Sequence, residues 1–386
     1  MGDVFAAAPK MSRSIPICIV LGTRPEAIKL APVIRLFQQD DALDTRVVLT
    51  GQHREMVAQV MTLFDIAADL DLEIMQAQQT LTDITCRTLR GLEQVFQEQR
   101  PELVLVQGDT TTAFAAALAA FYQKIPVGHV EAGLRTDQLM DPYPEEANRR
   151  LVSQIAQLHF APTVQAVSNL KQSGVSDRIY HTGNTVIDAL LAVADGQPPC
   201  EVPGLDWSRS RVLLSTVHRR ENWGAPLKAI AQGLRQVVEE HPDVALLLPL
   251  HRNPTVREPL KAILGSHSRI FLTEPLDYAA LVGAIQRCDL LLTDSGGLQE
   301  EAPSLGKPVL VLRETTERGE AIAAGTAKLI GTDSARIVAE TRQLLEDDTT
   351  YNQMATAINP FGDGKASQRI LQRVRQFFDL DDVSAI

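Results

Sequence analysis

Three acidic side chains stand where predicted strands end or a predicted helix begins, and these are positions from which side chains can do chemistry. Asp109 follows the apolar run 102–107, Glu131 follows the run 127–130, and Glu145 opens a helix after Pro144. Asp109 could instead cap the next helix, and Glu145 could simply suit a helix dipole. Glu131 has no such structural explanation. Together the three carboxylates are suited to proton transfer.

A glycine turn after the first apolar run, 15–21, predicts an anion site. Gly22 leads into a helix whose N-terminus offers backbone N–H groups, and Arg24 and Lys29 add positive charge there. The alternative interpretation is a capped surface helix with solvated basic residues. The chain lacks the GxGxxG fingerprint, so no nicotinamide cofactor is predicted, and no other cofactor either.

The second half of the chain carries two further candidate phosphate sites. His218 precedes two arginines at a strand-to-helix junction, which favours an anion site. The turn Ser295-Gly296-Gly297 opens another helix and lets the backbone approach a phosphate closely. Glu301, farther along that helix, could reach a ribose diol or could be a solvated helix residue. Arg318 lies in the next loop.

Buried apolar runs alternate with helical stretches, which is typical of parallel sheets covered on both faces. The pattern occurs twice, so an α/β fold of two Rossmann-like domains with a cleft between them is predicted. A segment rich in proline and glycine is the best linker candidate. The predicted parts are an N-terminal domain (14–194), the linker (195–210), a C-terminal domain (211–364) and a helix (365–380) that packs back on the N-terminal domain.

Composition excludes several classes of protein. The net charge of −11 argues against general nucleic-acid binding, although local basic clusters can still bind a small anion. No apolar run approaches the roughly 20 residues of a membrane span. The four cysteines fit neither a zinc site nor a disulfide framework. We therefore expect no bound metal, no membrane insertion, and reduced thiols in the cytoplasm.

The motifs resemble those of the non-hydrolysing UDP-N-acetylglucosamine 2-epimerases. The matching segments, in the order of the chain, are GTRPEAIK, TGQHREM, QGDTTT, HVEAGLRT, PYPEEANRR, GNTVIDAL, HRREN and DSGGLQEEAPSLGKPVLVLRETTERGE. They cover about residues 15 to 375. The resemblance implies a fold of the glycosyltransferase-B type, usually as a homodimer. It also implies interconversion of UDP-GlcNAc and UDP-ManNAc.

The resemblance assigns roles to individual residues. It implies that Asp109, Glu131 and Glu145 are the acid and base carboxylates, and that His218 acts near the diphosphate. The implied substrate-binding residues are Arg24, Lys29, Arg135, Ser295, Gly296, Gly297, Glu301 and Arg318. Bacterial members also bind a second, allosteric UDP-GlcNAc. Its implied contacts are Gln52 and the PEEANR and HRREN segments, and Glu55 departs from the glutamine that the family often has.

The implied mechanism is elimination of UDP to 2-acetamidoglucal, followed by re-addition with protonation on the opposite face of C2. Which carboxylate is the acid and which is the base stays open. Three alternatives remain at this point. The substrate could be a modified UDP-amino sugar such as a UDP-2,3-diacetamido uronate, the protein could be a glycosyltransferase of the same fold, or it could be a regulator that binds nucleotide sugars without catalysis.

Overall fold

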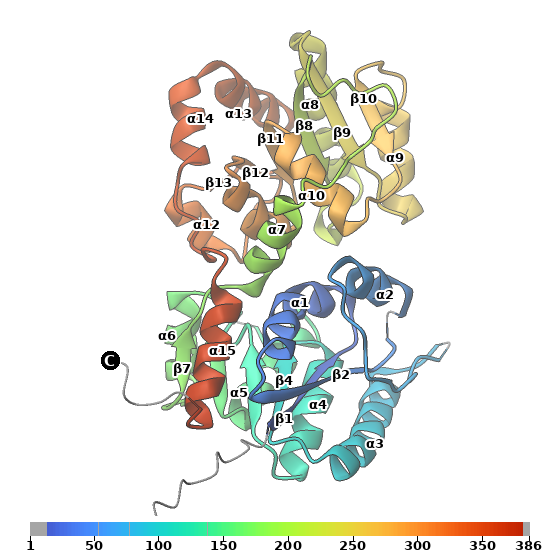
Figure 1. Cartoon of the computed structure of the whole chain (residues 1–386). Coiled ribbons are helices and arrows are strands. Elements are labelled where there is room, and N and C mark those ends of the chain that lie inside the picture. Colours follow the sequence, from blue (N-terminus) through green and yellow to red (C-terminus); the bar gives the residue numbers. More distant parts are fainter. Residues whose placement is uncertain (1–13, 53, 77, 137, 381–386) are drawn as a thin grey trace, which may run out of the picture. The chain divides into compact units, whose positions relative to one another are not determined.

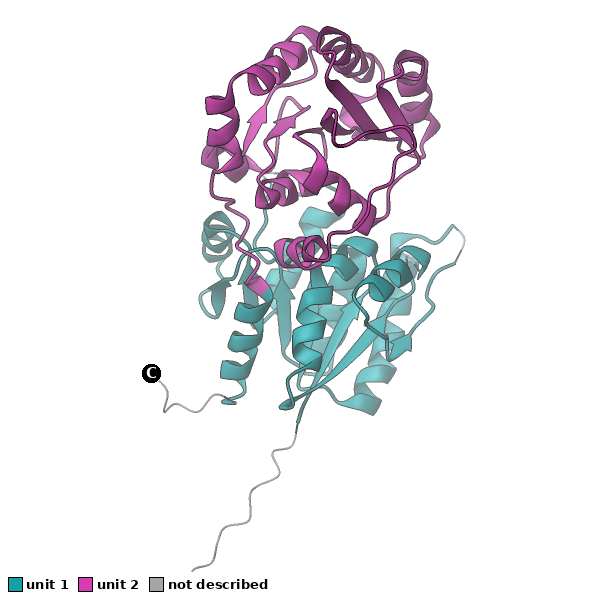
Figure 2. Ribbon diagram, turned by 45° about the horizontal axis from the view of Figure 1, so that its top comes forward, with its two compact units in different colours: residues 1–185, 367–386 teal, residues 186–366 magenta. Residues whose placement is uncertain are grey.

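The computed structural model describes residues 14–52, 54–76, 78–136 and 138–380, and it divides into two compact units (Figure 2). Unit 1 comprises residues 1–185 and 367–386, and unit 2 comprises residues 186–366. Each unit contains one parallel β-sheet with its helices (Figure 1). The predicted class, α/β with two Rossmann-like domains, is confirmed. Among the described helices, none has the length and apolarity needed to cross a membrane.

Unit 1 contains a seven-stranded parallel sheet with the order β3-β2-β1-β4-β5-β6-β7. Its first six positions follow the 3-2-1-4-5-6 order of a doubly wound fold. The strands are β1 (Ile15–Leu21), β2 (Leu43–Leu49), β3 (Leu70–Asp71), β4 (Leu103–Gln107), β5 (Val127–Val130), β6 (Leu158–Ala161) and β7 (Ile179–His181). The runs 15–21, 102–107 and 127–130 predict β1, β4 and β5, and the segment 46–50 predicts β2, whereas the sequence does not predict β3, β6 and β7.

The helices of unit 1 cover this sheet. They are α1 (Arg24–Gln38), α2 (Arg54–Leu63), α3 (Leu81–Gln99), α4 (Thr111–Tyr122), α5 (Glu145–Ile155), α6 (Val164–Gln172) and α15 (Ala366–Phe377). One core cluster joins Val20 and Val104 of the sheet to Phe96 of α3 and Ala116 of α4. The small side chains of α4, with the sequence TTAFAAALAAFY, let it pack closely between α3 and α5.

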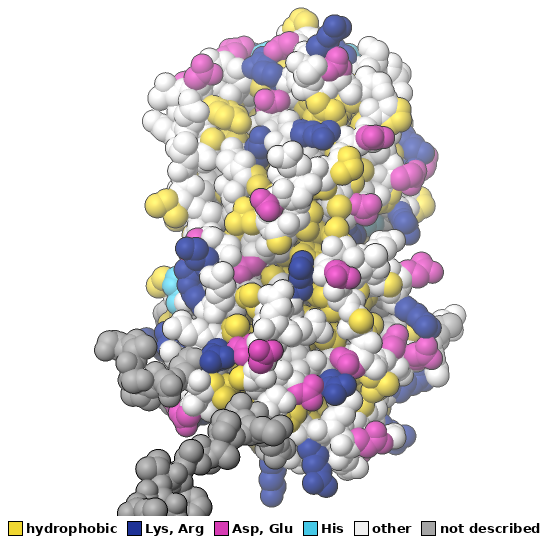
Figure 3. All heavy atoms as spheres, viewed as in Figure 1, with side chains coloured by type: hydrophobic (Ala, Val, Ile, Leu, Met, Phe, Trp, Pro, Cys, Tyr) yellow, Lys and Arg dark blue, Asp and Glu magenta, His cyan; other side chains and the backbone are white. Residues whose placement is uncertain are grey.

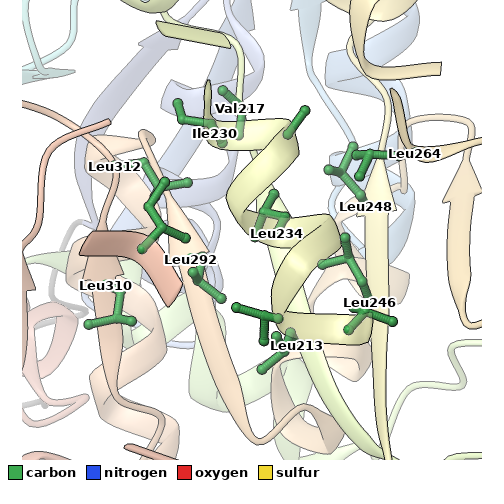
Figure 4. Close-up of a cluster of buried hydrophobic side chains, with 14 of the residues drawn as sticks. Leu213, Val217, Ile230, Leu234, Leu246, Leu248, Leu264, Leu292, Leu310 and Leu312 are labelled. Carbon is green, nitrogen blue, oxygen red and sulfur yellow. The ribbon is translucent and has the colours of Figure 1, made fainter. Parts of the chain in front are cut away.

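Unit 2 repeats the arrangement with six parallel strands in the order β10-β9-β8-β11-β12-β13. They are β8 (Arg211–Thr216), β9 (Val244–Pro249), β10 (Ile270–Thr273), β11 (Leu290–Thr293), β12 (Val309–Val311) and β13 (Ala327–Leu329). The helices are α7 (Thr185–Asp195), α8 (Ala225–Glu240), α9 (Pro254–Leu264), α10 (Tyr278–Arg287), α11 (Gly296–Glu301), α12 (Gly319–Ala324), α13 (Ser334–Glu346) and α14 (Asp348–Ala355). Figure 4 shows Leu213, Leu246 and Leu292 of this sheet clustered with Leu234 of α8.

The division between the units differs from the predicted boundary. It falls between Thr185 and Val186, so α7 belongs to unit 2 rather than to an N-terminal domain that ends at 194. The proposed linker 195–210 is also part of unit 2. Its Cys200 is buried, and Trp207 lies under the guanidinium of Arg287 from α10 at 5.9 Å. The segment lacks sequence periodicity because it packs as irregular chain against a helix.

The C-terminal helix α15 belongs to unit 1, apart from its first residue. Arg375 forms an ion pair with Asp40 at 2.6 Å, and Arg369 donates to the carbonyl of Thr182 at 2.9 Å. These contacts hold the end of the chain on the domain in which the chain begins. Over the face that Figure 3 shows, acidic and basic side chains are interspersed, so no field of one sign covers it.

Each sheet has one topological switch point, where the strand order reverses. A doubly wound sheet binds its ligands at this point. In unit 1 that place lies between β1 and β4, and in unit 2 it lies between β8 and β11. The predicted site residues follow these strands directly: Gly22 follows β1, Asp109 follows β4, His218 follows β8, and Ser295 follows β11. The fold therefore places the chemical motifs where ligand-binding loops are expected.

Candidate active site

The turn after β1 is fixed by Glu26, a side chain that the sequence does not single out. Glu26 is 1% exposed. Its Oε2 accepts from the N–H groups of Gly22 and Thr23 at 2.9 and 2.6 Å, and its Oε1 accepts from the Thr110 hydroxyl at 2.5 Å. Burial raises the pKa of Glu26, whereas these hydrogen bonds lower it. Glu26 thereby ties the glycine turn to the loop that carries Asp109.

Glu131 lies at the tip of β5, buried among hydrogen-bond donors. Its backbone has a φ of 63°, in the left-handed region that few non-glycine residues adopt. Its Oε1 accepts from Lys29 Nζ at 2.5 Å and from Asn184 Nδ2 at 3.0 Å. Its Oε2 accepts from the side-chain amide of Gln107. Both oxygens of the carboxylate are thus held in place.

Lys29 therefore contacts a carboxylate in this structure. The sequence places this lysine at the nucleotide-sugar site, but here its ammonium lies one turn into α1 and is 17% exposed beside Glu131. Arg24, the other basic residue of the motif, opens α1 and is half-buried. Of the two, Arg24 is the more available for an anion, because Lys29 already neutralises Glu131.

Asp109 is the second carboxylate held by a cation. Its Oδ2 accepts from Arg149 Nη2 at 2.6 Å, and its backbone carbonyl accepts from Asn148 Nδ2 at 2.9 Å. Both donors come from α5, so this helix positions the loop after β4. Asp109 is 27% exposed, and a ligand can therefore reach it. Because β4 and β5 pair directly in the sheet, Asp109 and Glu131 follow neighbouring strands.

Of the two consecutive acids at the start of α5, only Glu146 is part of the framework. It is fully buried and accepts from the Thr136 N–H at 3.0 Å and from Arg150 Nε at 2.6 Å. Arg149 lies 3.3 Å from it, so one guanidinium bridges Glu146 and Asp109. Glu145 opens the helix and is half-buried. Glu145 therefore stays the predicted acid or base of this helix.

A buried histidine supports the turn between β4 and Asp109. His129 is fully buried in β5, and its Nε2 lies 2.7 Å from the carbonyl oxygen of Gly108. Since a carbonyl oxygen only accepts, Nε2 carries the proton and donates. Burial lowers the pKa of His129 to about 3, so the ring is neutral at physiological pH.

Arg135 serves the framework of unit 1. Its guanidinium donates to the Leu134 carbonyl at 2.8 Å, to Ser153 of α5 at 2.9 Å and to Ser173 at 3.4 Å. Burial lowers the pKa of Arg135. The resemblance implies that Arg135 contacts the substrate. In this structure its hydrogen bonds instead hold the loop after Glu131 against α5 and the end of α6.

In unit 2, Asp294 organises the loop that carries His218. Asp294 is fully buried at the end of β11. Its carboxylate accepts from the backbone N–H groups of His218 and Arg219 at 2.9 Å and from Asn222 Nδ2 at 3.0 Å. Since β8 and β11 are neighbours, this one side chain connects the loops at the divergence point of the sheet.

The ring of His218 lies between an acid and a second histidine. Its Nδ1 is 3.2 Å from Asp294 Oδ1, and its ring stacks on His251 with centroids 5.8 Å apart. Burial lowers the pKa of His218, and nearby cations act in the same direction, although Asp294 opposes them. The side chain is still 39% exposed, so it is available to a ligand. His251, which follows β9, is thus brought to His218.

The turn Ser295-Gly296-Gly297 lies among charged side chains. A Cβ on Gly296 would come within 3.4 Å of Arg219 Nη2 and of Arg318 Cζ, and within 3.3 Å of Glu317 Oε1. A Cβ at these distances would press on the three charged groups, so the glycine keeps this space open for another group. The backbone N–H groups that open α11 and the two guanidinium groups together form a site suited to a phosphate.

Glu317 is the carboxylate that balances these arginines. Burial alone would raise the pKa of Glu317, but Arg318, a backbone N–H, Arg313 and Arg219 together lower it to about 2. Arg318 also donates to Glu300 at 2.7 Å. Glu300 and Glu317 therefore hold the guanidinium group of Arg318 in place beside the glycine turn.

Glu301, the predicted ribose ligand, is only 7% exposed, so the alternative of a solvated helix residue is wrong. Its Oε1 accepts from the hydroxyl of Tyr278 at 3.0 Å. It also lies beside the glycine turn, because a Cβ on Gly297 would be 3.6 Å from Glu301 Oε2. The carboxylate is therefore next to the candidate phosphate site, where a ribose would attach to the diphosphate.

The structure adds residues that sequence reasoning missed. Gln107 and Asn184 hold Glu131, Arg149 holds Asp109, and Asp294 and Glu317 organise the loops of unit 2. All five stand inside motifs that the sequence analysis quotes. Apart from Arg313 and Arg318, which contact Glu317, their partners are remote in sequence, so spacing alone gives no signal for them. Among the described residues, no group of three or more His, Cys, Asp or Glu could hold a metal ion.

Comparisons with known proteins indicate the family to which the chain belongs. Residues 35–375 match the family model described as UDP-N-acetylglucosamine 2-epimerase. The chain is 50% identical over 371 residues to the UDP-N-acetylglucosamine 2-epimerase of Salmonella typhimurium strain LT2, covering 94% of this chain and 98% of that protein. Both the model and this relative extend over most of the chain.

Solved structures give the same result. The UDP-GlcNAc 2-epimerase of Neisseria meningitidis, bound to UDP-GlcNAc, is 47% identical with a TM-score of 0.86, over 94% of this chain and 100% of that one. The enzyme of Methanocaldococcus jannaschii in complex with UDP-GlcNAc and UDP is 32% identical with a TM-score of 0.75, over the same shares of both chains. The chain belongs to the UDP-N-acetylglucosamine 2-epimerase family.

Proposed function

We propose that this protein interconverts UDP-GlcNAc and UDP-ManNAc by inverting C2 of the sugar. One observation carries the proposal beyond family membership. Two carboxylates, Asp109 and Glu131, follow neighbouring strands of unit 1, and each is held by a cation from a helix. A 2-epimerase needs groups for proton transfer and groups for diphosphate binding. Unit 1 supplies the first set, and unit 2 supplies the second.

The reaction is an elimination and an addition. The C2–H bond of the sugar is not activated by a carbonyl group, so direct deprotonation is unfavourable. A carboxylate takes the C2 proton, the C–H electrons form a C1–C2 double bond, and UDP leaves with the electrons of the anomeric C–O bond. UDP then adds back to the 2-acetamidoglucal while C2 receives a proton on the opposite face. The sequence of steps is redox-neutral.

The two units divide this chemistry. In unit 2, His218, the Ser295-Gly296-Gly297 turn and Arg318 stabilise the diphosphate as it gains charge, while Glu301 binds the ribose. In unit 1, Arg24 adds positive charge for the substrate, and Asp109, Glu131 and Glu145 supply the proton-transfer groups. Arg135 supports the loop of Glu131. Two faces of C2 require more than one such group, which explains why several acids are present.

Three further properties are proposed from the family resemblance. The protein is a homodimer, for which the exposed Phe121 and Tyr122 at the end of α4 are candidate contacts. It acts in the cytoplasm, in keeping with its four free cysteines. It binds a second UDP-GlcNAc near Gln52, whose Oε1 accepts from Thr112 at 3.0 Å. Light scattering tests the first, and the number of UDP-GlcNAc molecules bound per chain, measured by calorimetry, tests the last.

The activity is tested by incubating the protein with UDP-GlcNAc in deuterated water and observing C2 by NMR. We expect UDP-ManNAc to appear and deuterium to replace the C2 proton in both sugars. Unchanged substrate without exchange would refute the proposal. Exchange only with a UDP-2,3-diacetamido uronate would show that the enzyme acts on a modified sugar instead.

A further inference from the structure

Two carboxamide side chains hold the Glu131 carboxylate, and the reaction as described above does not use them. Gln107 ends β4, and Asn184 lies between β7 and α7. Asn184 Nδ2 donates to Oε1 of Glu131 at 3.0 Å, and Gln107 Nε2 donates to Oε2. One carboxamide therefore contacts each oxygen of the carboxylate.

All three side chains are buried. Gln107 is 3% exposed, Asn184 is 2% exposed, and Glu131 is 9% exposed. Burial opposes ionisation of a carboxyl group unless donors compensate for the lost water. The ammonium of Lys29 and two amide N–H groups are such donors, because each stabilises the ionised form of Glu131.

The arrangement also fixes how Glu131 is oriented. Its backbone has a positive φ, which sets the direction in which the side chain leaves the chain. Donors on both oxygens then prevent the carboxylate from rotating about its last bond. The donors come from α1, from the end of β4 and from the segment before α7, so three separate elements define one plane.

We propose that Gln107 and Asn184 are positioning residues of the epimerase reaction. They fix the plane of the Glu131 carboxylate and, with Lys29, keep it ionised in the direction of the reaction in which Glu131 removes the C2 proton. In the reverse direction the protonated Glu131 returns that proton to C2. The proposal rests on the proposed function. It also answers a question that the sequence leaves open, because it gives Glu131 the part of the base.

Isosteric substitutions test this role. Gln107→Glu and Asn184→Asp keep the shape of each side chain but replace a donor by a second carboxyl group beside Glu131. Two neighbouring carboxyl groups resist double ionisation. We therefore expect the acidic limb of the pH profile of kcat/KM to move up by about one pH unit or more. At pH values below both the original and the shifted pKa, activity should fall by about tenfold or more, and it should largely return at higher pH, with KM for UDP-GlcNAc and the Kd for UDP unchanged.

Gln107→Leu provides a second, uncharged variant, which removes the donor without adding repulsion. Its acidic limb should move in the same direction but less far. The control is Gln154→Glu, because Gln154 is an exposed carboxamide of α5 that donates to the Ser173 carbonyl at 3.2 Å. This control should keep the profile of the unmodified enzyme. Circular dichroism and UDP binding establish that each variant is folded.

The outcomes separate the two proposals. If the unmodified protein shows no exchange at C2, the proposed function fails. If that protein is active but the folded Gln107 and Asn184 variants keep its pH profile, or lose activity equally at every pH, the positioning role is refuted. If the charged variants do not fold, Gln107→Leu decides: an acidic limb that moves to higher pH supports the positioning role, and an unchanged limb refutes it.

Discussion

The ammonium of Lys29 lies 2.5 Å from Oε1 of Glu131, in a part of unit 1 where both side chains are largely shielded from water. A lysine in a GTRPEAIK motif invites assignment to the phosphates of the substrate. Its partner in the structure is instead the carboxylate that we assign to proton transfer. We infer from this pairing that Lys29 keeps the proposed base charged rather than holding the nucleotide.

Replacing Lys29 by methionine tests that role. The variant keeps the apolar stem of the side chain but removes the charge, so the ionised form of Glu131 loses its strongest donor. We expect kcat to fall by about 100-fold or more, within the range of general acid–base effects. The Kd of UDP, measured by calorimetry, should change by less than about twofold. A large loss of UDP affinity would return Lys29 to the phosphate site.

Close backbone packing in the loop after Glu131 leads to a stability prediction. Gly133 has a φ of 94°, and a Cβ there would lie 2.3 Å from the carbonyl oxygen of Ala166. Gly133→Ala should lower the free energy of unfolding by about 3 kcal/mol, because backbone strain and steric overlap add. Urea denaturation measures this loss.

Gly174→Ala is the matched control for that experiment. Gly174 has a φ of 87°, but a Cβ there would meet nothing within 4 Å. It should cost about 1 kcal/mol, which is the backbone term alone. Equal losses in the two variants would show that the contact with Ala166 is relieved by a small movement of the loop.

Glu317 leads to a prediction about pH. Its pKa is about 2 in the folded protein, below the ordinary value of 4.5. An acid whose pKa is lower in the folded than in the unfolded state stabilises the folded protein at pH values above the unfolded pKa. This stabilisation is lost as the pH falls from about 4.5 to about 2. Glu317→Gln should therefore be less stable than the unmodified protein at pH 7, and the difference should shrink below pH 4.5. Urea midpoints at pH 7, 4 and 3 test this. A constant difference would contradict the assigned ion pairs.

The sequence predicted the central strands, which are buried on both faces, better than the strands nearer the edge of the sheet. Runs such as Ile15–Leu21 and Leu290–Thr293 are continuous and apolar, and both are central strands. By contrast, Leu158–Ala161 contains a buried histidine, and Ile179–His181 is a short, half-buried edge strand. Such strands are specified by their neighbours in the sheet, so a local pattern cannot reveal them.

The candidate site was also predictable only in part. Motif types and strand ends located Asp109, Glu131 and His218, because polar residues at the ends of buried strands are informative by themselves. The partners of these residues were not predictable. Asn184 is 53 residues from Glu131 and Arg149 is 40 from Asp109, and only the packed fold brings them together.

The central claim is that the anomeric C–O bond breaks during each turnover, and an isotope experiment tests it directly. UDP-GlcNAc would be prepared with ¹⁸O in the bridge between C1 and the β-phosphorus and incubated with the enzyme. If UDP is eliminated, the β-phosphate can rotate before it adds back, so ³¹P NMR should show ¹⁸O moving into the non-bridging positions of recovered substrate. If epimerisation proceeds while all the ¹⁸O stays in the bridge, the elimination mechanism is contradicted.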